Sequence, residues 1–223
     1  MAKNNVPEVN EFDETLAASK SFFEKNKKTI VYGGSAILAI IIAVLLTNQF
    51  YIQPRNQKAN EALAKAEQLF MAGTYDKALN GDGESAGFLG VIDSYGSTKA
   101  GNLACLYAGI CYAKDNKFQE AADMLEKFDG CGDAMISPAA IGMLGNVYAE
   151  LGNNEKAAAY LVKAADAADN NTLSPIFLVQ AGQIFEALGN NDKALDCYKK
   201  VKTNYLQSQQ NAEVEKYIER LSK

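Results

Sequence analysis

The chain contains no histidine and no tryptophan among its 223 residues. Without histidine, metal sites, serine or cysteine triads and imidazole proton shuttles lose their commonest member. A Gly-rich phosphate loop at a strand–helix junction is missing too. Carboxylate-only chemistry is the one enzymatic alternative left open, but no Asp or Glu pair stands out from ordinary solvated helix faces. We therefore expect no enzyme activity and no catalytic, cofactor-binding or metal-binding residues.

An excess of basic residues is also missing, because 22 Lys and Arg stand against 27 Asp and Glu, a net charge of −5. This weighs against nucleic acid and against wide contact with anionic lipid. We also expect no small-molecule substrate. The four cysteines include no Cys-x-x-Cys pair. Cys105 and Cys111 face different ways on one predicted helix, Cys197 falls in a later helix and Cys131 lies between two glycines. We expect small buried hydrophobes and one loop thiol, without a disulfide framework.

Charge is missing altogether between Lys28 and Arg55. A bilayer core of roughly 30 Å needs about 20 helical residues, which this run supplies. The run predicts a transmembrane helix over residues 29–53. A buried core helix is one alternative, although such helices seldom lack charge for so long. A cleaved signal peptide is the other, but its apolar stretch would start earlier and a small-x-small site would follow it.

Basic residues near the two ends of the run predict its orientation. Four lie before it and two or three after it: Lys20, Lys25, Lys27 and Lys28, then Arg55, Lys58 and Lys65. Acidic residues count for little in this rule. We therefore expect a cytoplasmic segment over residues 1–28 and a translocated domain over residues 54–223.

The segment before the run has an apolar stripe at helical spacing, made by Phe12, Leu16, Ser19 and Phe23 with Phe22 beside it. It predicts an amphipathic helix that lies in the interface or docks on a membrane partner, the alternative being a loosely ordered tail. Small residues in the run would let a partner helix approach closely. The residues predicted to contact a membrane partner are Phe12, Leu16, Phe22, Phe23, Gly33 and Gly34.

The remaining chain is self-similar. Three segments have a glycine, an aromatic residue three positions later and an alanine twelve positions later. The glycines are Gly109, Gly145 and Gly182, and the alanines are Ala121, Ala157 and Ala194. Each segment contains a turn rich in Asn, Asp and Gly that favours a helix stop and restart.

This pattern resembles the tetratricopeptide repeat family, whose consensus has Gly at position eight, an aromatic at eleven and Ala at twenty. The resemblance implies an all-α solenoid of three regular repeats over residues 102–206. A degenerate repeat precedes them, interrupted at residues 80–84 and resuming at Ser85 or Ala86. A cap follows at residues 209–221. The chain departs from the family in lacking tryptophan at position four and in its slightly longer period, which a longer second helix, as at residues 160–169, would explain.

The same resemblance implies that partners bind the concave face, lined by positions two, five, nine and twelve to thirteen of each first helix. The residues at these positions are Leu63, Glu67, Phe70, Met71, Leu103, Leu106, Ile110, Lys114, Asn146, Glu150, Gln183 and Glu186. The first two repeats are apolar there and the last two are polar. Packing between repeats is the alternative role for Leu106 and Ile110. No basic residue accompanies Asn146, so capture of a free carboxyl terminus is not expected.

The whole layout resembles the YfgM family, through the Ser-Phe-Phe-Glu-Lys-Asn-Lys-Lys element at residues 21–28. This resemblance implies a single-pass protein of the bacterial inner membrane with a periplasmic repeat domain. It also implies partnership with the SecYEG translocon and a PpiD-like periplasmic chaperone, without catalysis. The alternative is an adaptor of another envelope machine, such as cytochrome maturation or outer-membrane assembly, which would not require the Phe22-Phe23 element.

Overall fold

The structure, a computed structural model, describes residues 11–222, with side chains from residue 15 onward. Every regular element in this described part is a helix. The chain divides into two compact units at the boundary between Pro54 and Arg55.

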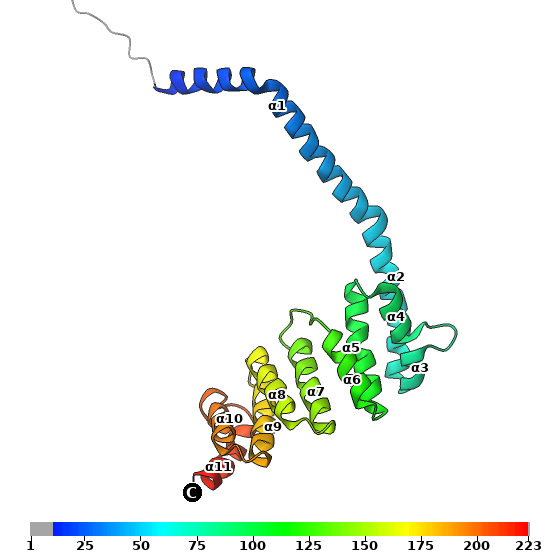
Figure 1. The fold of residues 1–223 in the computed structure, drawn as a ribbon, viewed down its shortest axis with the longest axis vertical. Coiled ribbons are helices and arrows are strands. Elements are labelled where there is room, and N and C mark those ends of the chain that lie inside the picture. The colour runs from blue at the N-terminus through cyan, green and yellow to red at the C-terminus, as the bar shows by residue number, and fades with distance from the viewer. Residues whose placement is uncertain (1–10, 223) are drawn as a thin grey trace, which may run out of the picture. The chain divides into compact units, whose positions relative to one another are not determined.

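The first unit consists of helix α1, Glu11–Thr47, and a short π-helix, η1, Asn48–Ile52 (Figure 1). Its apolar stretch is long enough to cross a membrane, and none of that stretch is buried. The hydroxyl groups of Ser35 and Thr47 donate to the backbone carbonyls of Tyr32 and Ala43. Such bonds satisfy polar groups that lipid cannot. The structure therefore contains the predicted helix that is long and apolar enough to span a membrane.

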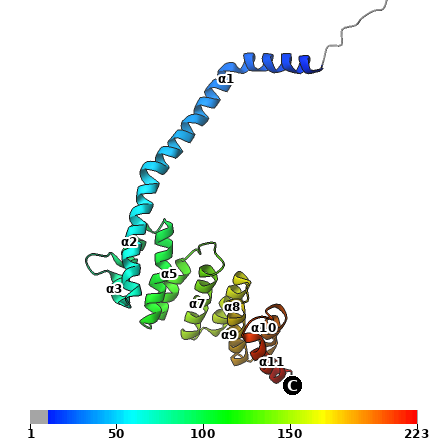
Figure 2. The same cartoon turned by 180° about the vertical axis from the view of Figure 1, so that it is seen from behind.

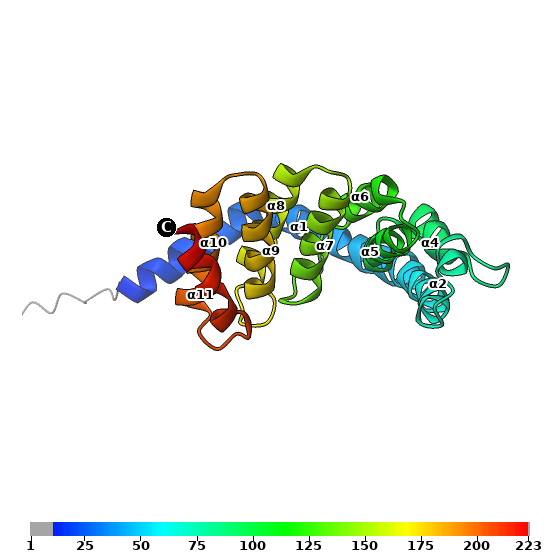
Figure 3. The same cartoon turned by 90° about the horizontal axis from the view of Figure 1, so that it is seen from below.

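The second unit is a row of helical hairpins (Figure 2). The first hairpin pairs α2, Gln53–Met71, with α3, Tyr75–Asn80, and α4, Gly87–Tyr95. The next three pair α5, Lys99–Lys114, with α6, Phe118–Lys127; α7, Ile136–Glu150, with α8, Asn154–Ala168; and α9, Ser174–Ala187, with α10, Asn191–Asn204. Helix α11, Gln210–Leu221, follows. Figure 3 shows α6 and α8 along one side of the row and α5, α7 and α9 along the other.

One turn geometry closes all four hairpins. In the third, the Gly152 N–H donates to the Ala149 carbonyl and the Asn153 N–H to the Tyr148 carbonyl, both at 2.9 Å. This pair of bonds satisfies the last carbonyls of a helix and needs a left-handed residue. The residues with positive φ at this place are Gly73, Asn116, Gly152 and Gly189. The turn at Gly73 confirms that the degenerate segment is a repeat in the same register.

The predicted close approach of the paired helices is confirmed at position eight. A Cβ atom placed on Gly145 would lie 2.9 Å from Cγ of Leu161 and 3.1 Å from the carbonyl oxygen of Ala157. Carbon atoms normally pack at about 3.5–4.0 Å. The alanines at position twenty are fully buried across the same contact: Ala78, Ala121, Ala157 and Ala194. The hairpins are therefore held by backbone and small side chains meeting directly.

The interruption in the first repeat is an ordered turn. The Asp82 carboxylate accepts from the backbone N–H groups of Ser85 and Glu84, which lower the pKa of Asp82. Helix α4 then begins at Gly87, one residue later than the latest start expected from the sequence.

The extra residues of the repeats are placed in two ways. Helix α8 has 15 residues, as the longer second helix predicted, whereas α6 has only 10. In that earlier repeat the extra residues form a loop over residues 128–135, so the expectation was wrong there. The Asn102 side chain holds this loop, accepting from the Asp129 N–H at 2.8 Å and donating to the Gly130 carbonyl at 2.9 Å.

The predicted cap is confirmed as α11. Val214 is fully buried against α9 and α10, and the Tyr217 ring stacks on Tyr198 with centroids 5.0 Å apart. The Arg220 guanidinium pairs with the Glu186 carboxylate at 2.6 Å. An end repeat needs such a cover for its apolar face.

The predicted states of the four cysteines are also confirmed. Cys105, Cys111 and Cys197 are buried thiols, whereas Cys131 is exposed. Burial raises the pKa of Cys111 and of Cys197 to about 11. These buried thiols are therefore protonated and behave as small hydrophobes.

Asp133, in the loop before helix α7, caps the start of that helix. Its carboxylate accepts from the backbone N–H groups of Met135, Ile136 and Ser137 and from the Ser137 hydroxyl. These bonds, that of Met135 foremost, lower the pKa of Asp133 to about 2. Because the pKa is lowered on folding, the charged carboxylate stabilises the fold fully at pH values above the pKa of an unfolded Asp, about 3.9. That contribution is lost as the pH falls through about 2.

The contact at Gly145 yields a stability prediction. Gly145→Leu should destabilise the domain by about 1–3 kcal/mol, because the new side chain forces α7 away from α8. The measurement is the thermal midpoint of the full chain in detergent, followed by circular dichroism. Asn146→Leu is the matched control, since the neighbouring Asn146 is exposed. Equal midpoints for the two variants would contradict the close packing.

The cap at Asp133 yields a pH prediction. Asp133→Ala should lower the thermal midpoint at pH 7, and its difference from the parent should close between about pH 4 and pH 2. Asp133→Asn is the control, because it keeps a capping acceptor that does not titrate. Midpoint differences for Asp133→Ala that do not change with pH would show that the carboxylate does not act through its charge.

Candidate partner-binding surface

The first helices of the four hairpins, α2, α5, α7 and α9, form one layer whose outward surface we call the helix A face. All twelve residues predicted to bind a partner belong to these four helices. Two neighbouring hollows lie on this face, one between α5 and α7 and one between α7 and α9.

The hollow between α5 and α7, the apolar cavity, has a volume of about 300 Å³. Its lining residues are Leu103, Leu106, Tyr107, Ile110, Ile136, Ala139, Ala140 and Met143. Ile136 is 46% exposed, whereas Leu106 is only 8% exposed. The structure therefore brings the predicted Leu103, Leu106 and Ile110 together in one cavity.

The hollow between α7 and α9, the polar cavity, has a volume of about 260 Å³. Its lining residues are Asn146, Asn154, Gln180, Gln183, Ile184 and Ala187. Four of these side chains carry amides, which offer both donors and acceptors. The buried Oε1 of Gln180 has no hydrogen-bond partner within the described residues.

The first repeat uses its predicted residues mainly for internal packing. Leu63 is 7% exposed and belongs to the core. The Phe70 ring packs against Tyr107 and Phe88, with centroids 5.2 and 6.1 Å away. Burial, and then the neighbouring Glu67 carboxylate, raise the pKa of Tyr107. Met71 stands out from this cluster at 77% exposed.

The remaining predicted residues lie outside the apolar cavity. Lys114 lines a small cavity of about 100 Å³ with Tyr75 and Asp76, and Glu150 is exposed. Helix α11 engages the last repeat, where Glu186 pairs with Arg220 and the Gln183 amide donates to the Tyr217 hydroxyl at 3.4 Å. The cap thus covers the end of the helix A face.

The residues predicted to contact a membrane partner lie in α1. Leu16, Phe22 and Phe23 are exposed there. A Cβ atom on Gly33 or Gly34 would meet nothing within 4 Å. Phe12 is part of α1, but its side chain is outside the described residues. Their role stays a prediction.

Sequence reasoning missed Tyr107, Ile136 and Met143. Ile136, Ala139 and Met143 are three and four residues apart on α7, the spacing of one helix face. That spacing is a signal the sequence offered. Ile136 was missed because it precedes the first consensus position of its repeat, so a scan restricted to consensus positions leaves it out.

The helix A face is suited to binding a polypeptide, because its two cavities contain amides and apolar side chains. Among the side chains of residues 15–222, no three His, Cys, Asp or Glu groups gather closely enough to hold a metal ion.

Solved structures of similar fold are helical repeat proteins. The chain is similar to YrrB, described as a tetratricopeptide protein with an unusual peptide-binding site, with 22% identity over 79% of this chain and 81% of that chain, and a TM-score of 0.57. One structure of MamA gives 19% identity, 70% and 92% coverage and a TM-score of 0.50. A second structure of MamA gives 18% identity over 73% of this chain and 89% of that chain, and a TM-score of 0.53. These identities show the fold alone.

The comparison with protein families is more direct. A search of the curated proteins gave no match. The profile of the tetratricopeptide repeat-like domain family, however, matches residues 20–222. This match covers the repeat register derived from Gly145 and its counterparts, together with most of α1. The chain therefore belongs to the tetratricopeptide repeat-like domain family.

Proposed function

We propose that this protein is a membrane-anchored scaffold that works as an ancillary subunit of the SecYEG translocon. Its repeat domain would lie in the periplasm and pass secreted chains to a PpiD-like chaperone. The repeat fold itself is a protein-interaction scaffold. The finer assignment is supported by the likeness of residues 21–28 to the YfgM family and by the four lysines that precede the apolar stretch.

The observation that carries this proposal is the apolar cavity lying beside the polar cavity on the helix A face. An extended segment of a partner could place an apolar side chain against Ile136 and Met143. Its backbone would then meet the amides of Asn146 and Gln183, whose donors and acceptors match peptide groups. The site thus recognises an unfolded polypeptide without demanding a particular charge.

The size of the apolar cavity indicates weak binding. About 300 Å³ accommodates one or two side chains, each contributing roughly 1.5–3 kcal/mol when buried. Ordering the partner segment offsets part of that gain. Weak, quickly reversible binding suits a protein that receives a passing chain and releases it to a chaperone.

Ile136→Asp tests the helix A face. A carboxylate in the apolar cavity should reduce co-purification of the PpiD-like chaperone and secreted chains by about tenfold, because about 1.5 kcal/mol of apolar burial is lost. Since Ile136 is 46% exposed, helical content should not change. Leu151→Asp is the matched control, at the end of the same helix, 38% exposed and outside both cavities. Equal recovery with both variants would show that partners bind elsewhere.

Exchange of residues 1–52 for an unrelated membrane anchor tests the translocon assignment. The exchange should weaken co-purification of SecYEG, because Leu16, Phe22, Phe23 and the small residues of α1 are lost, while chaperone binding persists. Protease added to spheroplasts should degrade the repeat domain of both chains, which serves as the control for orientation. Undiminished recovery of SecYEG with the exchanged anchor would instead favour an adaptor of another envelope machine.

A further inference from the structure

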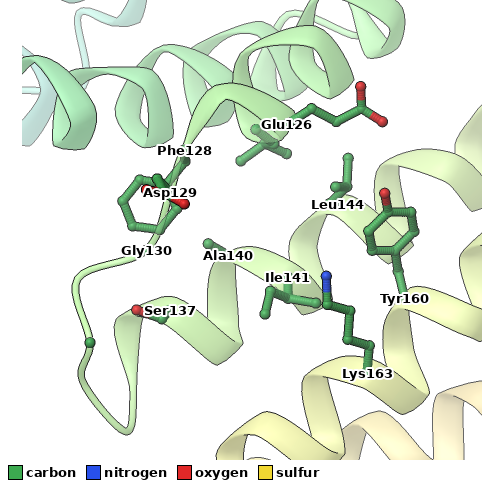
Figure 4. A pocket seen from close by; sticks show the side chains of 12 residues that line it. Glu126, Phe128, Asp129, Gly130, Ser137, Ala140, Ile141, Leu144, Tyr160 and Lys163 are labelled. Atoms are coloured by element: carbon green, nitrogen blue, oxygen red, sulfur yellow. The ribbon is translucent and has the colours of Figure 1, made fainter. Parts of the chain in front are cut away.

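A larger cleft, of about 610 Å³, lies on the other side of α7, between α6 and α8 (Figure 4). We call it the helix B cleft. Its floor is apolar and consists of Leu125, Ala140, Ile141 and Leu144. Apart from Ala140, none of its lining residues belongs to the apolar cavity or the polar cavity.

The cleft exists because α6 is short. In the next hairpin, α8 continues to Ala168, and its last turns bury Ala164 and Ala165 in one core cluster with residues of α9. Helix α6 is five residues shorter, which at about 1.5 Å per residue leaves about 7.5 Å of helix missing. The last turns of α8 thus cover the neighbouring hairpin with apolar side chains, whereas α6 has no corresponding turns and leaves the equivalent surface uncovered.

The wall of the cleft formed by residues 128–135 is held in place. Asn102 bonds Asp129 and Gly130, and the Ser137 hydroxyl accepts from the Cys131 N–H at 2.8 Å. Ser137 is itself fixed by the Asp133 carboxylate. The loop is therefore anchored to α5 at one end and to α7 at the other, and it does not fold over the apolar floor.

The rim of the cleft has an unequal charge. The carboxylates of Glu126 and Asp129 line the cleft near the end of α6, and that of Glu126 accepts from the Tyr148 hydroxyl. The backbone dipole makes this helix end negative, although Lys127 in its last turn, outside the lining, offsets part of that charge. Lys163 faces the two carboxylates as the one cation in the lining, with its Nζ atom 5.8 Å from the Tyr160 ring centroid. The Phe128 and Tyr160 side chains add aromatic surface (Figure 4).

We propose that the helix B cleft binds a segment of a partner protein that presents an aromatic side chain next to a Lys or Arg. The aromatic side chain occupies the space of the missing helical turn, against Ile141 and Leu144. Its ring meets the edges of Phe128 and Tyr160, as aromatic pairs prefer. The basic side chain lies toward Asp129 and the end of α6. This site would bind independently of the helix A face.

The test measures binding of a fluorescent peptide, acetyl-Ala-Lys-Phe-Arg-Ala-amide, to the full chain in detergent by anisotropy. Saturable binding is expected, about tenfold weaker when alanine replaces the phenylalanine or glutamate replaces both basic residues. Equal binding of the three peptides, or no binding of any, would overturn the proposal.

Two substitutions with opposite effects locate the site. Asp129→Lys should weaken binding of the basic peptide, whereas Lys163→Glu should strengthen it, each by several-fold, since they change the rim charge in opposite directions. A loss of folding would weaken binding in both variants, so the opposite signs exclude that explanation. Glu219→Lys, at an exposed position on α11, is the control for net charge and should have no effect.

Two further results separate this site from other occupants and from the proposed function. Ile136→Asp should leave peptide binding unchanged, because Ile136 lines only the apolar cavity. If Ile136→Asp abolishes binding, the peptide sits on the helix A face and the helix B cleft is not its site. If the full chain forms a dimer that Asp129→Lys dissociates, the occupant is a second copy and the proposal is wrong.

Discussion

The direct contact between the two helices of each hairpin is the constraint on which the rest of the domain depends. At Gly145 the α7 backbone lies so close to Leu161 and Ala157 that a single added carbon would collide. Because backbone and small side chains fill this contact, the larger side chains of α7 are free to point between hairpins or outward. Among the α7 side chains directed away from this contact, Met143 lines the apolar cavity and Ile141 lines the helix B cleft.

The features readable from the sequence are those fixed by local geometry. The stop-and-restart turns, the buried alanines such as Ala157 and the cap at Val214 each follow from a residue type at a set spacing, and the structure confirms them. What the sequence could not give depends on contacts between distant segments. Phe70 occupies a consensus binding position, yet it packs against Phe88 and Tyr107, because the irregular first repeat brings α4 beside it. The short α6 was also not foreseen, since its end is set by the Asn102 contact with a loop 27 and 28 residues away.

Tethering changes what weak sites can do. Under the two proposals, each site would hold one or two side chains of a partner and would bind weakly by itself. A domain anchored near the point where partner chains emerge meets them at a high effective concentration, so two weak contacts on one partner combine into useful avidity without any new contact. Under the proposed function, the helix A face and the helix B cleft would then differ in the task they perform: the first accepts polypeptide of general composition, and the second selects by aromatic and basic side chains.

Ala140 is the one residue that lines both the apolar cavity and the helix B cleft. Ala140 is 5% exposed, and the two hollows lie on either side of it. The two hollows thus share one small side chain and no other lining residue. A larger residue at position 140 would therefore narrow both hollows at once, whereas a change at any other lining residue alters one hollow and leaves the lining of the other intact.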